Sequence, residues 1–121
     1  MIKHMSPDGR WIASGTEEGV VSVQSIVSGD ERWSAPWAHQ GPVRVIAWSP
    51  DEAAVASGGE DGRVNVWETA TGTVLALYTE HTEPISALDW SPDGCWITSA
   101  EETGGPHIWP IQHNDTDGPA R

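Results

Sequence analysis

The segment that decides the fold is Val43–Trp67, which reads VRVIAWSPDEAAVASGGEDGRVNVW. It contains short runs rich in β-branched, small and aromatic residues, which are typical of strands. Two turn signals separate these runs. In Ser49-Pro50-Asp51 the proline presets φ for a type I turn, and in Asp61-Gly62 the glycine tolerates the positive φ of a tight hairpin. The segment therefore predicts three consecutive antiparallel strands, at Val43–Trp48, Ala53–Gly58 and Arg63–Trp67.

The pattern of this segment recurs on both sides of it. Ser49-Pro50-Asp51 is preceded by Ser6-Pro7-Asp8 and followed by Ser91-Pro92-Asp93, at intervals of 43 and 42 residues. The same spacing relates two pairs of residues, His39 with His81 and Trp48 with Trp90. It also relates three triplets: Ser14, Ser57 and Ser99; Gly19, Gly62 and Gly104; and Gln24, Trp67 and Trp109. Fixed periods of this length are the signature of a repeat architecture. The 121 residues hold about three such units.

Each unit is predicted to be a small β-sheet. A fourth strand, Thr73–Tyr78, follows the turn at Thr71-Gly72. The segment Glu68–Thr79 can also be drawn as a helix, but its β-branched residues and short turn-to-turn spacing favour a strand. Because the first strand, Val43–Trp48, is apolar almost without a break, we expect both faces of the sheet to be buried. Four short antiparallel strands, sandwiched between neighbours, are the arrangement of a propeller blade.

Composition narrows the range of functions. Six Lys and Arg against 18 Asp and Glu give a formal charge of -12, which repels phosphate backbones and argues against nucleic-acid binding. The single cysteine, Cys95, excludes an internal disulfide framework and a multi-cysteine zinc site. No apolar run is long enough to span a membrane, and the N-terminus lacks the apolar core of a signal peptide. We therefore expect a soluble chain of the cytoplasm or the nucleus.

These residues resemble the WD-repeat β-propeller family over roughly residues 2–111. Val64–Glu68 stands where the family has its Trp-Asp signature, with Glu68 in place of the aspartate. Ala38-His39 and Glu80-His81 stand at the family's Gly-His position, without the glycine. The resemblance implies an all-β fold, a partial β-propeller of about three four-stranded antiparallel blades. The implied blades cover about 1–37, 38–79 and 80–111. Residues 112–121 are polar and have no strand pattern, so we expect a disordered tail there.

The resemblance also implies a buried hydrogen-bonded set in each blade. In the family, this set joins a histidine before the innermost strand, a serine or threonine on the second strand, an aspartate in the next turn and a tryptophan on the third strand. The matching residues of the second unit are His39, Ser57, Asp61 and Trp67. Those of the third unit are His81, Ser99 and Trp109, with Thr103 where the aspartate is expected. The first unit has no upstream histidine and has Met5 where the others have tryptophan, so we expect an incomplete first blade.

Three blades cannot close a ring, since propellers have about four to eight blades. We therefore expect both end faces of the stack to expose apolar sheet. The third unit also lacks the pattern of a fourth strand, and Pro106 within its third strand fits an edge. Three explanations stay open: a fragment of a longer propeller, two copies that pair into six blades, or a ring completed by another protein.

Catalysis and cofactor binding are not expected. The spacing of His39, Ser57 and Asp61 suggests a catalytic triad, but the blade network explains it and would bury the serine beside an indole. His107 and His113 lack the spacing of tetrahedral metal ligands, so we predict no metal site. No lysine follows Gly58-Gly59 or Gly104-Gly105 in the spacing of a phosphate loop, so we predict no nucleotide or other cofactor.

In the family, partner peptides often dock on the face that carries the loops before the first strand and after the second. The resemblance therefore implies the candidate partner-binding residues Glu17, Gln40, Pro42, Arg44, Glu60, Thr82, Pro84, Ser86 and Glu102. Nearby Glu18, Glu83 and Glu101 add negative charge, so we hypothesise an acidic face that recruits a basic segment of a partner protein. The alternative is a solvated acidic rim that only maintains solubility.

The function predicted from the sequence is a non-catalytic scaffold for protein–protein interaction, part of a larger or oligomeric propeller. The alternative is an accessory propeller segment of a longer enzyme or signalling protein whose catalytic domain lies elsewhere.

Overall fold

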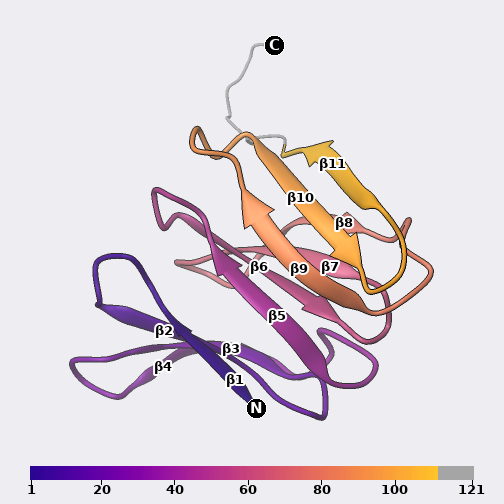
Figure 1. Cartoon of the computed structure of the whole chain (residues 1–121). Helices are drawn as coiled ribbons and strands as arrows, with labels where there is room; N and C mark the ends of the chain where they lie inside the picture. Colours follow the sequence, from indigo (N-terminus) through magenta and orange to yellow (C-terminus); the bar gives the residue numbers. More distant parts are fainter. Residues whose placement is uncertain (112–121) are drawn as a thin grey trace.

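A computed structural model describes residues 1–111, so the predicted tail at 112–121 and His113 lie outside the described residues. Within that range the chain forms eleven strands and no helix. The strands make three antiparallel sheets that stack face to face along the chain (Figure 1). The prediction of an all-β partial propeller is confirmed. No helix among the described residues could cross a membrane.

The three sheets follow the order of the chain, and we call them the first, second and third blades. The first blade holds β1 (Ile2–Met5), β2 (Trp11–Gly15), β3 (Val21–Ser25) and β4 (Glu31–Ala35). The second holds β5 (Val43–Trp48), β6 (Ala54–Gly59), β7 (Val64–Glu68) and β8 (Val74–Tyr78). The third holds β9 (Ile85–Trp90), β10 (Trp96–Glu101) and β11 (Pro106–Pro110). The strands predicted for the second unit are confirmed to within one residue at their ends.

The first blade is complete in strands, so the expectation that it would be incomplete is wrong in this respect. Its four strands pair in the order β1-β2-β3-β4. The residues that it lacks belong to the side-chain network, whereas strand pairing depends on backbone groups and turns. The third blade has three strands in the described range, and β11 forms its outer edge.

The repeated Ser-Pro-Asp turn is closed by side chains as well as by backbone. Each serine Oγ donates to the aspartate two residues later, at 2.9, 2.7 and 2.6 Å in the three blades. Each serine Oγ also accepts from the amide five residues later, at 3.0, 3.1 and 3.0 Å. The fourth turn residue has a positive φ in every blade: 77° at Gly9, 65° at Glu52 and 74° at Gly94.

Two hydrophobic cores join the blades. Val21, Val23 and Val55 belong to the core between the first and second blades, which also buries Trp67. A second core lies between the second and third blades and contains Val64, Val66, Ile85, Ile97 and Trp109. Glycines allow the sheets to approach closely. A Cβ at Gly15 would lie 2.5 Å from Val43, and one at Gly58 would lie 2.7 Å from Ile85.

The two end faces of the stack differ, which corrects the expectation that both would be apolar. In the first blade, the alternation along the strands turns Ala13 and Val23 toward the second blade. The opposite face includes the apolar side chains of Met5 and Ile12, but most of its side chains are polar. The polar side chains are those of Lys3, Ser14, Ser22, Gln24 and Ser34. The outer face of the third blade keeps the expected apolar character, with Ile108 67% and Trp96 46% exposed.

The outer edge of the third blade is blocked by proline. The amide of Ile111 donates to Cys95 O at 2.8 Å, so the backbone hydrogen-bonding groups of Ile111 point toward β10. In the alternate residues Pro106, Ile108 and Pro110, the positions of these groups therefore point outward, away from β10. Two of these three positions have no N–H. A further strand would therefore find one donor where a regular ladder offers three.

Candidate functional site

The structure brings together the four residues of the predicted network in the second blade. His39 precedes β5, Ser57 and Trp67 lie on β6 and β7, and Asp61 lies in the turn between those strands. His39 Nε2 lies 2.9 Å from Ser57 Oγ, and the indole N–H of Trp67 donates to the same oxygen at 3.0 Å. His39 Nδ1 lies 3.1 Å from Asp61 Oδ1. Because burial disfavours the imidazolium, the pKa of His39 is lowered.

Asp61 also organises the loop before β5. Its second oxygen accepts the amide of Gln40 at 2.9 Å, and its first accepts the amide of Arg63 at 3.1 Å. Asn65 on β7 donates to Ala38 O at 2.8 Å. The backbone of the loop that precedes the innermost strand is therefore held by two side chains of its own blade, Asp61 and Asn65.

The third blade builds the same network with a different carboxylate. His81 Nε2 lies 2.6 Å from Ser99 Oγ, and the indole of Trp109 donates to Ser99 at 3.0 Å. His81 Nδ1 lies 2.8 Å from Glu101 Oε2, and the amide of Thr82 donates to the same oxygen at 3.2 Å. The hydrogen bond from His81 and the one from Thr82 help to lower the pKa of Glu101.

The structure places Thr103 outside this network, which corrects the predicted position. Its hydroxyl and its amide both donate to Glu83 Oε1. Glu101 stands at the repeat position of Gly59, 42 residues earlier. A Cβ at Gly59 would lie 2.6 Å from His39 Nδ1. Strand pairing is irregular at this point in both blades, so the two blades differ here in the side chain and not in the pairing. The carboxylate of the third network comes from the strand end and not from the turn.

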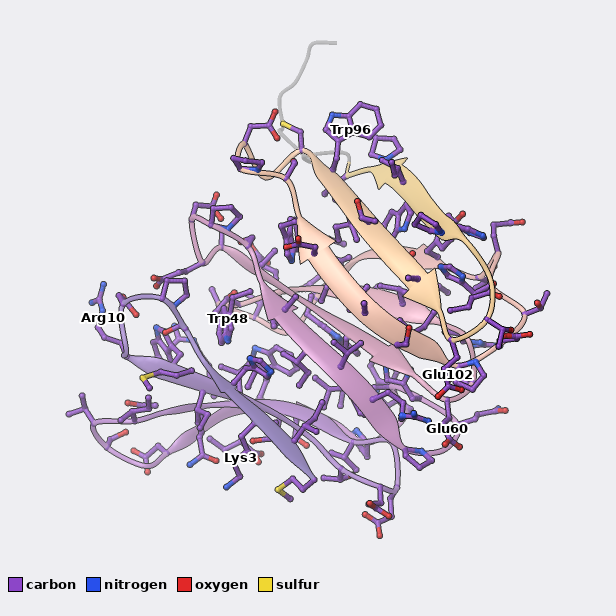
Figure 2. All side chains as sticks on the ribbon, in the orientation of Figure 1. Lys3, Arg10, Trp48, Glu60, Trp96 and Glu102 are labelled. Atoms are coloured by element: carbon purple, nitrogen blue, oxygen red, sulfur yellow. The ribbon has the colours of Figure 1, made fainter. Side chains whose placement is uncertain are left out.

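The predicted partner-binding residues lie around the loops at one end of the blades. Three of them form a charged contact across two blades: Arg44 Nη1 donates to Glu60 Oε2 at 2.8 Å, and Arg44 Nη2 lies 3.9 Å from Glu102 Oε2. Figure 2 shows Glu60 and Glu102 close together at this end. We call Glu60, Glu102 and their neighbours Glu17, Glu18 and Glu83 the acidic rim.

The other predicted residues of this face differ in exposure. Gln40, Thr82 and Ser86 are exposed, and Ser86 Oγ donates to Ala100 O at 3.2 Å. Pro42 and Pro84 are half-buried in the loops that precede β5 and β9. Glu17 is exposed in the turn between β2 and β3 of the first blade.

His81, Glu101 and His107 bring nitrogen and carboxylate atoms within 4.8 Å of one another. Both ring nitrogens of His81 already contact Ser99 and Glu101, and His107 Nδ1 lies 2.8 Å from the Tyr78 hydroxyl. The rings of His81 and His107 stack with centroids 3.9 Å apart and planes 16° apart. Lone pairs in nearly parallel planes do not converge on one point, so this cluster fits a hydrogen-bonded stack better than a metal centre.

The triad-like set of the second blade is closed to substrate. Ser57 is 0% exposed, and its hydroxyl lies beside the Trp67 indole. A nucleophile needs an accessible oxygen and an adjacent site for the reacting carbonyl. The arrangement therefore serves packing, not acyl transfer.

The sequence analysis missed a recess between the first and second blades. Trp11, Arg32, Glu52, Glu68 and Thr69 line it. The signal lay in the repeat itself, because Glu52 replaces the glycine that ends the other two Ser-Pro-Asp turns. The convergence of these residues from two sheets could not be derived before the blades were placed side by side.

Comparison with known proteins agrees with this architecture. Residues 4–93 match the family model described as the anaphase-promoting complex subunit 4 WD40 domain. Over 91% of this chain and 64% of the other, the fold matches the crystal structure of the computationally designed Ika4 protein, with a TM-score of 0.80 and 27% identity.

Two curated relatives match parts of the chain. The ribosome biogenesis protein erb1 of Aspergillus fumigatus is 35% identical over 60 residues, which is 47% of this chain and 8% of that protein. The periodic tryptophan protein 2 homolog of Dictyostelium discoideum is 41% identical over 74 residues, which is 60% of this chain and 8% of that protein. The matched region thus spans about 8% of the length of these relatives.

Proposed function

Since the chain belongs to the WD40-repeat family, we propose that it acts as a scaffold for protein–protein interaction without catalytic activity of its own. Blades at about 1–37, 38–79 and 80–111 form the proposed units of the scaffold. The networks of His39 and His81 fix the loops before β5 and β9, so the loops are held in one conformation. Preformed loops lose little entropy when a partner binds them.

The acidic rim is the proposed docking face, and the observation that carries this proposal is the contact of Arg44 with Glu60 and Glu102. It aligns carboxylates from two blades at one end of the stack. Together with a formal charge of -12, these carboxylates favour a basic segment of a partner protein.

A peptide-display library panned against the immobilised chain tests this proposal, with the selected clones measured again as synthetic peptides. We expect peptides rich in lysine and arginine that bind the double variant Glu60→Lys, Glu102→Lys at least tenfold more weakly and with a shallower salt dependence. Glu31→Lys, an exposed charge reversal on β4, serves as the control and should bind like the native chain. Unchanged binding to the double variant would leave the rim with a role in solubility only, and failure to select any peptide would contradict the scaffold.

A second function is favoured by the lengths of the relatives. Because the matched region covers about 8% of them, an accessory propeller segment within a longer enzyme or signalling protein is the alternative. Assays for catalytic activity, made on the protein that the full reading frame encodes, distinguish the scaffold from the accessory segment. We propose a location in the cytoplasm or the nucleus, supported by relatives named for ribosome biogenesis.

A further inference from the structure

The stack of blades has two open ends within residues 1–111. We call the face of a blade that points toward the following blade its forward face, and the opposite one its rear face. No described sheet covers the forward face of the third blade or the rear face of the first blade. Figure 2 shows Trp96 and Lys3, which belong to these two faces, at opposite ends of the stack. The two open faces can therefore meet only between two molecules.

The forward face of the third blade exposes positions that the other blades bury. Ile108 is 67% exposed, whereas Val23 and Val66 at the same repeat position are 0% exposed. Trp96 is 46% exposed, whereas Trp11 at its repeat position is half-buried and packs against the core between the first and second blades. In both internal contacts, the surface that covers these positions is the rear face of a blade. The exposed face therefore fits a further rear face.

Side-chain size changes in opposite directions on the two open faces. Relative to the second blade, the forward face of the third blade has larger residues, and the rear face of the first blade has smaller ones. The larger residues are Trp96 for Ala54, Thr98 for Ala56 and Ile108 for Val66, and the smaller ones are Met5 for Trp48, Ser22 for Asn65 and Gln24 for Trp67. Closely packed surfaces must conserve total volume. The two open faces compensate each other when they meet.

The internal contacts show which of these positions meet. Between the second and third blades, Ala54 of the forward face and Trp90 of the rear face line one recess. Trp96 and Met5 occupy the same two repeat positions on the open faces. The large side chain then projects from the forward face and the slimmer one from the rear face, so the same space is filled with the sizes reversed.

The tryptophan that Gln24 replaces has an aromatic neighbour in each internal contact. Trp67 and Trp109 lie against rings on the fourth strand of the preceding blade, with centroids 5.4 Å from Trp33 and 4.6 Å from Tyr78. The third blade has three strands within residues 1–111, so its described part offers no such ring. The glutamine of the first blade therefore suits a contact with the third blade.

Opposite charges stand on the innermost strands of the two open faces. Lys3 lies on β1, at the repeat position where the other two blades have the apolar residues Ile46 and Leu88. Asp89 lies on β9, at a position where neither of the other blades has an acidic residue. Both charged side chains are exposed. The charges thus occur only where a blade has no described neighbour.

The internal contacts also place the positions of Lys3 and Asp89 opposite each other. In both contacts, an indole of the rear face donates to the backbone carbonyl at the repeat position of Asp89. The two hydrogen bonds are those of Trp48 with His4 O, at 2.9 Å, and of Trp90 with Ala47 O, at 3.0 Å. The position of Lys3 lies two residues before that indole, on the same face of the innermost strand. An equivalent contact between two copies brings Lys3 of one copy beside Asp89 of the other.

We propose that a second copy of this chain stacks the rear face of its first blade on the forward face of the third blade, and that Lys3 of each copy pairs with Asp89 of the other. A contact between two different faces generates either a closed ring or an open filament. Two copies of three blades make six, within the range of about four to eight blades of closed propellers, so the ring closes with two copies. The ring carries one acidic rim from each copy, and this inference goes beyond the proposed function without depending on it.

Sedimentation equilibrium of the full chain over a range of concentrations tests the proposal. We expect a limiting mass of twice 13.0 kDa. Lys3→Glu or Asp89→Lys alone places like charges at both contacts of the ring, so each should raise the Kd of the dimer at least fivefold. An equimolar mixture of the two variants should dimerise like the native chain, because each contact of a mixed ring again joins opposite charges.

Arg63→Glu and Asp30→Lys are the matched controls, since they reverse exposed charges in the connections β6–β7 and β3–β4. Alone and mixed, they should dimerise like the native chain. Three results would overturn the proposal: a monomer at every concentration, a mass that grows beyond two copies, or a mixture that associates no better than the single variants. Two third blades that met face to face would leave Lys3→Glu without effect, and this result too excludes the proposal.

The acidic rim is tested independently by the display experiment. If the chain stays a monomer while the selected peptides still depend on Glu60 and Glu102, the scaffold function stands and the ring alone is rejected.

Discussion

At the scale of single residues, Ser57 Oγ is the atom that links two large side chains, His39 and Trp67. Ser57→Ala leaves an indole N–H and a ring nitrogen unpaired in a site that is 0% exposed. With about 1–3 kcal/mol for each of these two orphaned groups, we expect a loss of about 2–6 kcal/mol in the free energy of unfolding. Urea denaturation measures this loss. Ser34→Ala, an exposed serine on β4, should change stability by less than about 0.5 kcal/mol.

His39 predicts a pH dependence of stability. Its pKa in the folded chain is lowered from 6.5, so the unfolded chain binds the proton more readily. Its neutral form therefore contributes stability that is fully present above pH 6.5 and is lost as the pH falls toward the folded pKa. The expected slope approaches about 1.4 kcal/mol per pH unit.

Urea midpoints measured from pH 8 to pH 5 would test this expectation. The slope should shrink in His39→Gln and persist in His4→Gln, which alters an exposed histidine. An equal slope in both variants would contradict the assignment to His39.

The residues of the network show what the sequence could and could not predict at this scale. The shared spacing of serine and tryptophan located both networks, because those side chains project from regular strands with a fixed alternation. Thr103 was expected at the aspartate position of the third network, and this expectation was wrong. The carboxylate of this network comes from Glu101, which stands where the second unit has Gly59, so comparison of the two units gave no sign of it.

At the scale of elements, the approach of neighbouring sheets depends on glycine. Gly58→Ala places a Cβ 2.7 Å from Ile85 Cγ2, so β6 and β9 must separate. We expect a loss of about 1–3 kcal/mol in the free energy of unfolding, as for other overpacked cores. Ala100 occupies the equivalent position on the outer face of the third blade, and Ala100→Gly should cost only about 0.5–1 kcal/mol of strand propensity. Similar losses in the two variants would mean that the blades are not packed as described.

The strands themselves could be predicted closely, since turn residues bound each of them. The character of a sheet face was harder to predict. Lys3, Ser22 and Gln24 are scattered through the first unit, and they form one polar face only after β1, β2 and β3 pair in register. The recess at Glu52 was missed for the same reason, because its lining comes from turns and strands of two sheets.

At the scale of the whole molecule, the stack has one polar end and one apolar end. Ile108 and Trp96 on the outer face of the third blade are 67% and 46% exposed. We expect association that increases with concentration and that Ile108→Lys weakens, because apolar surface of this kind drives contact with another surface. Sedimentation velocity over a range of concentrations measures it. Met5→Lys, on the polar end face, should have a smaller effect, and a monomer at every concentration would contradict the expectation.

Each sheet is assembled from strands that follow one another directly along the chain. A blade therefore needs no segment from a distant part of the polypeptide, and its pairing involves short loops that close quickly. During synthesis, the first blade can form while the third is still in the ribosome. Duplication or deletion of one whole repeat would leave the backbone pairing of the others intact, which makes the repeat of 42 or 43 residues a natural unit of evolutionary change.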